Sequence, residues 1–291
     1  MKKGKIRTYF RQLNEALQME LQEHKSSFLV YFLLRASVIV IAILQLYKGN
    51  YENVFFCILT LLLFIVPSLI QVTFRIEIPS TLEIIIFCFI FAAEILGEIN
   101  HFYYLFPFWD TILHTLNGFL AAAIGLSLAD LLNKNERIQF ELSPLYTALV
   151  AFCFSMTIGV LWEFFEFGMD QFLGMNMQKD TIIHTLNSVP LDNAGTLMSI
   201  QNINSVVVNG HDLNVGGYID IGLIDTMQDL IVNFIGAVTF SVFGYFYTKN
   251  HGEDWVAKHF VPTRKKKSRD FLRIIRNKYK EKNEAKQKDS Q

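Results

Sequence analysis

Six apolar blocks, each about 20 residues long, constrain the fold of this chain more than any other feature. They cover residues 28–47, 53–73, 80–100, 109–132, 143–168 and 224–248. A block of about 20 apolar residues is long enough to cross the ~30 Å hydrocarbon core of a bilayer. Soluble cores are built from shorter, periodic segments, and only 18% of this chain is charged. Because a bilayer leaves backbone polar groups to be satisfied internally, we predict an all-α, polytopic bundle of about six transmembrane helices.

The positive charges predict how this bundle is oriented. Most of the 26 Lys and Arg residues lie in the N-terminal segment and in the C-terminal tail. The loops predicted to be external contain only Lys48 and Lys179 as cations. The positive-inside rule therefore places both termini in the cytoplasm, and we expect the protein in the bacterial cytoplasmic membrane. The net charge of −1 hides this separation.

Three parts follow from this topology. They are a cytoplasmic segment 1–27, a six-span domain 28–248 with an extracytoplasmic loop 169–222, and a basic cytoplasmic tail 249–291. In the tail, Phe271 and Ile275 lie among many cations, so a basic helix here would be drawn to anionic lipid of the inner leaflet. The alternative is a tail that only enforces orientation. Besides the bilayer, an envelope substrate is an expected partner, and no nucleic acid is expected.

Ionisable residues with helical spacing form four polar stripes at the outer ends of the third to sixth predicted spans. In chain order, with the amides among them, they are Glu94, Glu98, Asp110, His114, Asn117, Glu163, Glu166, Asp170, Asp225, Asp229 and Asn233. Residues spaced i, i+4 and i+7 share one helix face, and charged residues in membranes usually face a bundle interior or an aqueous cavity. We therefore expect an acidic pocket with one histidine that opens to the extracytoplasmic side.

The long external loop adds further polar groups. They are Asp180, His184, Asp192, His211, Asp212 and Asp220. Loops of this length are often lids or binding loops. The apolar run 206–208, followed by Asn209 and Gly210, predicts a small hairpin.

Carboxylates at such density do not all remain ionised without a cation nearby, so either a divalent metal binds or some of them stay protonated. The candidate metal ligands are Asp110, His114, Glu163 and Asp229. Carboxylates with one imidazole suit Mg²⁺, Mn²⁺ or Zn²⁺. A metal here would activate water or polarise a phosphoryl oxygen. The candidate catalytic residues are His114, Glu163, Glu166, Asp225, Asp229 and Asn233.

Three functions are compatible with these residues. The leading hypothesis is an outward-facing acidic/His site that binds or acts on an envelope or lipid-linked substrate. A proton- or cation-coupled small-molecule permease would need the polar stripes to continue across the bilayer. A non-catalytic immunity or scaffold protein would use the polar residues as helix–helix contacts, which explains Asn117 or Asn233 but explains the many carboxylates poorly.

Three motifs resemble the VanZ-like and YjdF-like group of small bacterial integral membrane proteins. They are Asp110-xxx-His114, Trp162-Glu163-xx-Glu166 and Asp229-xxx-Asn233-xx-Gly236, within residues 80–248. VanZ-like proteins tend to have an acidic residue followed by Gln in the middle motif. This chain has two glutamates there, which favours the YjdF-like branch. The resemblance implies an integral protein of the bacterial cell envelope.

Overall fold

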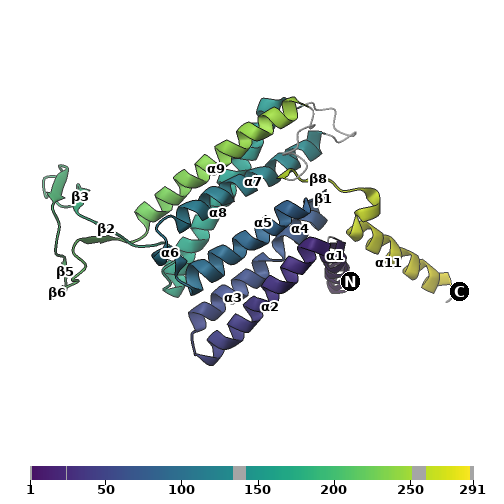
Figure 1. Cartoon of the computed structure of the whole chain (residues 1–291), viewed down its shortest axis with the longest axis horizontal. Coiled ribbons are helices and arrows are strands. Elements are labelled where there is room, and N and C mark those ends of the chain that lie inside the picture. Colours follow the sequence, from purple (N-terminus) through teal and green to yellow (C-terminus); the bar gives the residue numbers. More distant parts are fainter. Residues whose placement is uncertain (1, 24, 134–141, 251–259, 289–291) are drawn as a thin grey trace.

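The computed structural model describes residues 2–23, 25–133, 142–250 and 260–288. Within these ranges five helices are long and apolar enough to cross a membrane. They are Ser27–Tyr47, Tyr51–Phe74, Trp109–Asp130, Pro144–Leu173 and Leu223–Lys249. The chain is therefore a mostly helical, polytopic bundle, as its sequence predicts (Figure 1).

The predicted span 80–100 is helical but changes its geometry part of the way along. Helix α5 (Ser80–Phe91) is followed directly by a π-helix, η1 (Ala92–Ile99). Such i→i+5 segments are rare and often occur at functional sites. Five described helices are thus long and apolar enough to cross a membrane, against about six predicted, and this composite helix covers the remaining predicted block.

The second span is interrupted near its middle. It consists of α3 (Tyr51–Leu63) and α4 (Val66–Phe74), which follow α2 (Lys25–Tyr47) along the chain. Pro67 lies in the first turn of α4, where it lacks the amide hydrogen that would continue the ladder from α3. Proline therefore explains why one apolar block forms two helices.

Three long helices pack against one another to form the centre of the bundle: α7 (Trp109–Asn133), α8 (Pro144–Leu173) and α9 (Leu223–Lys249) (Figure 1). Glycines bring α7 and α9 together. A Cβ atom on Gly118 would overlap the backbone carbonyl of Asn233, and one on Gly236 would overlap that of Thr115. Ser155 of α8 donates a hydrogen bond to the Gly118 carbonyl at 2.7 Å. Small residues at helix crossings allow this close approach.

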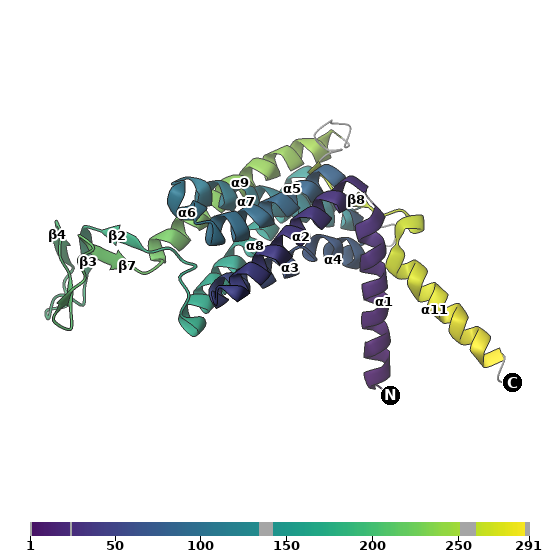
Figure 2. The same cartoon turned by 60° about the horizontal axis from the view of Figure 1, so that its bottom comes forward.

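One end of the bundle carries the segments predicted to be cytoplasmic. Helices α1 (Lys2–Glu23) and α11 (Phe271–Lys288) project from it (Figure 2). Strand β1 (Ile76–Glu77) pairs with β8 (Thr263–Arg264), and a 3₁₀ turn, η2 (Lys267–Arg269), follows β8. Lys134, Arg137 and residues 251–259, which also belong to predicted cytoplasmic segments, lie outside the described residues.

Contacts between α1, α4 and α11 hold this end together. Phe271 and Ile275 are buried against Ala16 and Val72. These two apolar residues of the basic tail therefore pack on protein, whereas Ile274 is exposed.

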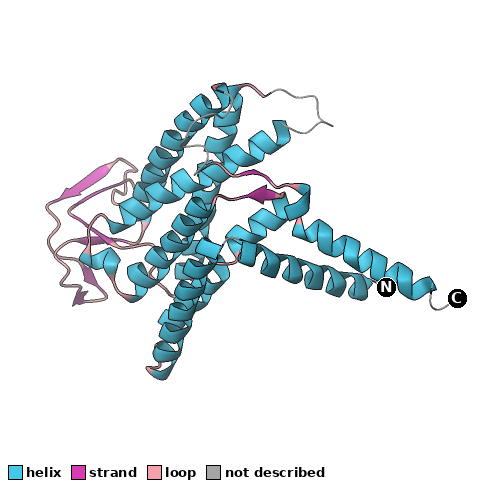
Figure 3. Ribbon diagram, turned by 45° about the vertical axis from the view of Figure 1, so that its right-hand side comes forward, coloured by secondary structure: helices cyan, strands magenta, loops and turns pink. Residues whose placement is uncertain are grey.

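The opposite end carries the short helix α6 (Phe102–Leu105) and most of the short strands of the described chain (Figure 3). There β2 (Thr181–Ile183) pairs with β7 (Tyr218–Asp220) across the strands between them. Two hairpins pair β3 (Thr185–Ser188) with β4 (Met198–Gln201) and β5 (Val207–Val208) with β6 (His211–Asp212). Asn209 and Gly210, both with positive φ, form the turn between β5 and β6, which confirms the hairpin predicted there.

Candidate functional site

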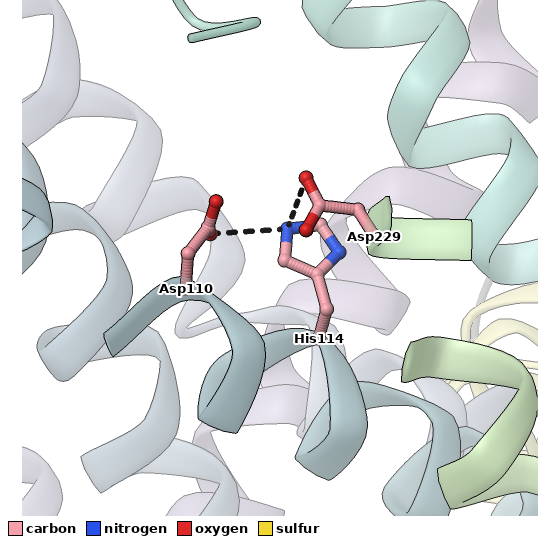
Figure 4. Close-up of side chains that lie close together, drawn as sticks. All are labelled: Asp110, His114 and Asp229. Atoms are coloured by element: carbon pink, nitrogen blue, oxygen red, sulfur yellow. Dashed lines mark ion pairs between the residues drawn. The ribbon is translucent and has the colours of Figure 1, made fainter. Parts of the chain in front are cut away.

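His114 lies among carboxylates from three helices. Its Nε2 atom is 3.4 Å from Asp110 Oδ1 and 3.6 Å from Asp229 Oδ2 (Figure 4). Its Nδ1 atom is 3.8 Å from Glu163 Oε1. His114, Glu163 and Asp229 are buried, and Asp110 is half-buried. The four residues that the sequence predicts as metal ligands thus meet around one imidazole ring.

Helix spacing and helix packing explain this convergence. Asp110 and His114 lie one turn apart on α7, and Asp229 reaches them because α9 packs closely on α7. The start of α7 is fixed by Trp109, whose indole nitrogen donates to the carbonyl of Ala92 at 3.3 Å. The local pattern was visible in the sequence, and the tertiary contact between helices supplies the third group.

The distances around Nε2 suit a divalent cation. Both are longer than the 2.7–3.2 Å typical of an N–H···O hydrogen bond, and one N–H cannot be linear to two carboxylates at once. Two ligand atoms that each lie about 2.0–2.2 Å from a tetrahedral zinc ion are about 3.3–3.6 Å apart. One ligand atom from each of Asp110, His114 and Asp229 lies within 4.8 Å of the others. These three ligands would leave a coordination position for water, as in catalytic zinc sites.

Glu163 occupies a different position from the other two carboxylates. It faces Nδ1, the nitrogen on the other side of the ring, so it does not share an ion with Nε2 of the same imidazole. A carboxylate at the second nitrogen of a ligating histidine fixes the ring orientation and the tautomer. The geometry therefore favours a positioning role for Glu163 over direct ligation. Its Oε2 atom is buried and has no hydrogen-bond partner among the described residues.

Asn233 lies one turn below Asp229 on α9 and is almost completely buried. Its Oδ1 atom accepts a hydrogen bond from Asn117 Nδ2 at 3.1 Å. Next to this amide pair, Gly118 and Gly236 lie where the backbones of α7 and α9 are in close contact. The amide pair thus lies between the cluster and this helix contact, and the predicted catalytic residue Asn233 is hydrogen-bonded to Asn117.

The other two predicted catalytic residues bond to groups outside the His114 cluster. Glu166 Oε1 accepts from the indole nitrogen of Trp162 at 2.8 Å. Asp225 Oδ2 accepts from the backbone amide of Lys179 at 2.7 Å. Among the described residues, the ion pairs of His114 are with Asp110, Glu163 and Asp229 and include neither of these two carboxylates.

Lys179 is a partly buried cation beside the cluster that the sequence pattern did not single out. Its Nζ atom is 2.7 Å from Glu98 Oε1 and lies over the ring of Tyr103, 4.6 Å from the centroid. Burial lowers the pKa of Lys179, but the Glu98 carboxylate raises it and the net pKa is higher than usual. The available signal was that Lys179 is the one Lys or Arg in the long, acidic loop 169–222 of the sequence.

The segment around Lys179 connects three helices across the hairpin side of the cluster. Asp170 at the end of α8 accepts from the backbone amides of Met177 and Gln178 at 2.6 and 2.9 Å. Gln178 also donates to the Thr226 hydroxyl at 2.5 Å. Together with the bonds of Lys179 to Glu98 and Asp225, these contacts hold the loop onto η1, α8 and α9.

Most of the polar groups predicted in the loop 169–222 bond to the loop itself or to the first turn of α9. Asp192 accepts from the amides of Ala194 and Thr196, and the Thr196 hydroxyl lowers its pKa. Other local bonds join Asp212 to Ser205 and Asn214, Asp220 to Ile224, and His184 to Ile203. Asp180 and His211 are exposed.

The fold and the cluster define a class: polytopic membrane proteins with a buried acidic/histidine cluster between their helices. A family model described as "Predicted membrane protein (DUF2238)" matches residues 28–250, and the chain belongs to this family. The matched range includes the whole His114 cluster and omits α1 and α11.

Comparison with curated proteins gives a relative without an assigned function. An uncharacterized protein of Thermotoga maritima is 33% identical over 104 residues, which cover 35% of this chain and 52% of that protein. The chain thus spans about half the length of the curated relative it matches. No solved structure matches the chain.

Proposed function

We propose that this chain is a metal-dependent protein of the bacterial cytoplasmic membrane, with an outward-facing site that acts on an envelope or lipid-linked substrate. The observation that carries the proposal is the shared position of Asp110 and Asp229 at Nε2 of His114, at 3.4 and 3.6 Å. Two helices thereby bring two carboxylates to one imidazole nitrogen at distances that suit a common cation better than hydrogen bonds.

The proposed chemistry is hydrolytic. A divalent ion held by three protein ligands makes a bound water more acidic and polarises a phosphoryl or carbonyl oxygen. Glu163 holds the imidazole through Nδ1. Glu166 and Asp225 are the nearby carboxylates proposed to accept and return the proton that the water loses.

The orientation of the site is part of the proposal. The segments predicted to be cytoplasmic, including β1, β8, α1 and α11, lie at one end of the bundle, and the hairpins lie at the other (Figure 2). Lys179, from the hairpin end, bonds to Glu98 and Asp225 beside the cluster. With both termini in the cytoplasm, as the positive charges favour, the cluster opens to the extracytoplasmic side.

Two finer assignments belong to the same proposal. Within its family, the chain is proposed to be of the YjdF-like rather than the VanZ-like type, because its middle motif contains Glu163 and Glu166.

The cations of α11 are proposed to bind anionic lipid of the inner leaflet, while Phe271 and Ile275 dock the helix onto the protein.

The geometry favours a hydrolytic site over a permease. A coupled permease needs polar groups along a path through the membrane. Here the cluster ends at the Asn117–Asn233 pair, and below it Ala122, Leu126 and Phe240 form an apolar core. A scaffold protein remains distinguishable by experiment, because it would tolerate loss of the carboxylates.

Metal binding tests the proposed function. Purified protein in nanodiscs should bind about one Zn²⁺ or Mn²⁺ per chain, measured by elemental mass spectrometry after dialysis against the metal. Asp229→Asn and His114→Ala should lose this ion. The matched control is Asp212→Asn, since Asp212 lies in a hairpin and bonds only to its own loop in the described structure. A wild-type protein that binds no divalent ion, or two site variants that bind as well as the wild type, would refute the proposal.

A further inference from the structure

A cavity of about 260 Å³ lies between the spans directly beside the His114 cluster. Its walls come from α3, α4, α5, η1, α6, α7 and α8, and most of its lining is apolar. Leu63, Val66 and Pro67 line it at the break between α3 and α4, so the interruption of the second span helps to form the space.

The polar residues of the cavity connect it with the cluster. His114 lines the cavity and is also the centre of the proposed metal site, and Asn117, Glu94 and Tyr103 line it too. Glu94 is only 3% exposed, and its Oε2 atom has no hydrogen-bond partner among the described residues. A buried acceptor without a partner is costly, so it is suited to a donor that a ligand brings.

The length of the cavity matches one leaflet of a bilayer. Along α7 its lining extends from Leu113 and His114 to Ile124. Ten residues of α-helix rise about 15 Å, which is half of a ~30 Å hydrocarbon core. Within that core the surrounding solvent consists of lipid hydrocarbon chains, so a hydrocarbon chain is the apolar ligand available to the cavity.

We propose that this cavity holds one hydrocarbon chain of an outer-leaflet lipid, whose hydrogen-bond-donating head group lies between Glu94 and the Asp110–His114–Asp229 site. The inference rests on the proposed function and assigns its substrate class: a membrane lipid, bound by its chain and presented by its head group. Glu94 accepts a hydrogen bond from a hydroxyl or amine of the head group. The position of the hydrocarbon chain in the cavity then determines which bond of the head group reaches the metal site.

Photo-crosslinking in proteoliposomes tests this assignment. The probes are phosphatidylglycerol and phosphatidylcholine with the same diazirine-bearing acyl chain, and mass spectrometry maps the labelled residues. Phosphatidylglycerol, whose head group donates hydrogen bonds, should label cavity residues such as Ile90 and Ile124 several-fold more than phosphatidylcholine, which has no donor. Equal labelling by both lipids would overturn the role of Glu94.

A matched pair of variants separates the cavity from the lipid-facing surface. Ile158→Trp fills the cavity, whereas Leu161→Trp adds the same side chain three residues later on α8, at a position that is 55% exposed and does not line the cavity. Labelling of Ile124 should fall at least five-fold in Ile158→Trp and stay unchanged in Leu161→Trp. The proposal that the cavity holds a hydrocarbon chain is contradicted if only exposed residues are labelled. It is also contradicted if Ile124 is labelled equally in the two variants.

The metal content of the same samples keeps the two proposals apart. Ile158→Trp should retain the bound ion, because it lies outside the ligand set. Metal binding without cavity labelling would overturn the lipid inference alone. Cavity labelling without metal binding would overturn the proposed hydrolytic function, and the cavity would stand as a lipid-binding site.

Discussion

Asp229 of α9 places its Oδ2 atom 3.6 Å from Nε2 of His114 on α7, too far for a hydrogen bond and close enough to share an ion. Both side chains are buried between helices that could not approach so closely without Gly118 and Gly236. The contact therefore depends on two levels of structure, the polar face of each helix and the small residues that set the distance between them.

Removing Asp229 should weaken metal binding far more than it weakens the fold. Asp229→Asn keeps the size of the side chain and removes the anionic ligand, so we expect the dissociation constant for Zn²⁺ to rise by about 100-fold or more. Competition with a fluorescent chelator measures the change. Asp192→Asn, at an exposed hairpin turn, should bind the ion like the wild type.

Glu163 should act through His114 and give a smaller effect. Glu163→Gln keeps a hydrogen-bonding group near Nδ1 but removes the charge, so we expect a loss of metal affinity of about 10- to 100-fold. Ligand-specific spectroscopy of Co²⁺-substituted protein should still report one histidine and two carboxylates. A spectrum that loses one carboxylate would instead identify Glu163 as a ligand.

The helix contact makes a further prediction that does not depend on the metal. Gly236→Val should destabilise the bundle by about 1–3 kcal/mol, since its side chain would meet the backbone of Thr115 on α7. Gly168→Val on α8 is the control, because the nearest atom to an added Cβ there is 4.0 Å away. Thermal unfolding in detergent compares the two. An equal loss of stability in the two variants would show that α7 and α9 are less closely packed at Gly236 than described.

The spans and the grouping of the polar residues were predictable from the sequence. The features that were not predictable all depend on contacts between segments far apart in the chain. The spans and the polar faces follow from composition and helical spacing, which are local, so Asp110, His114, Glu163 and Asp229 could be grouped in advance. The position of Lys179 depends on a loop that folds back to η1, and the β1–β8 pairing joins segments far apart in the chain. Local periodicity carries no signal for such contacts. Pro67, by contrast, was a readable sign of the helix break that lines the cavity.

Lys179 predicts a specific response to alkaline pH. Its pKa is raised in the folded state by Glu98, so this pair contributes stability that is fully present below the unfolded lysine pKa of about 10.4. That stability is lost as the pH rises through the higher folded pKa. Unfolding temperatures of the wild type should therefore fall above about pH 10.4, and Lys179→Met should show a smaller fall. If the unfolding temperatures of the two proteins fell equally with rising pH, the Lys179–Glu98 pair would be contradicted.

The end of the bundle opposite to the hairpins should depend on one buried ion pair. Lys265, which follows β8, pairs with Glu20 of α1, and both side chains are almost fully buried. Lys265→Met leaves a buried carboxylate without this cation, so we expect a loss of about 3–5 kcal/mol from the docking of the tail onto α1. Limited trypsin digestion should then cut α11 many times faster than in the wild type. Lys280→Met is the matched control, because the Lys280–Glu284 pair is exposed and contributes about 0.5 kcal/mol or less. Equal digestion rates in the two variants would show that Phe271 and Ile275, rather than the ion pair, hold the tail in place.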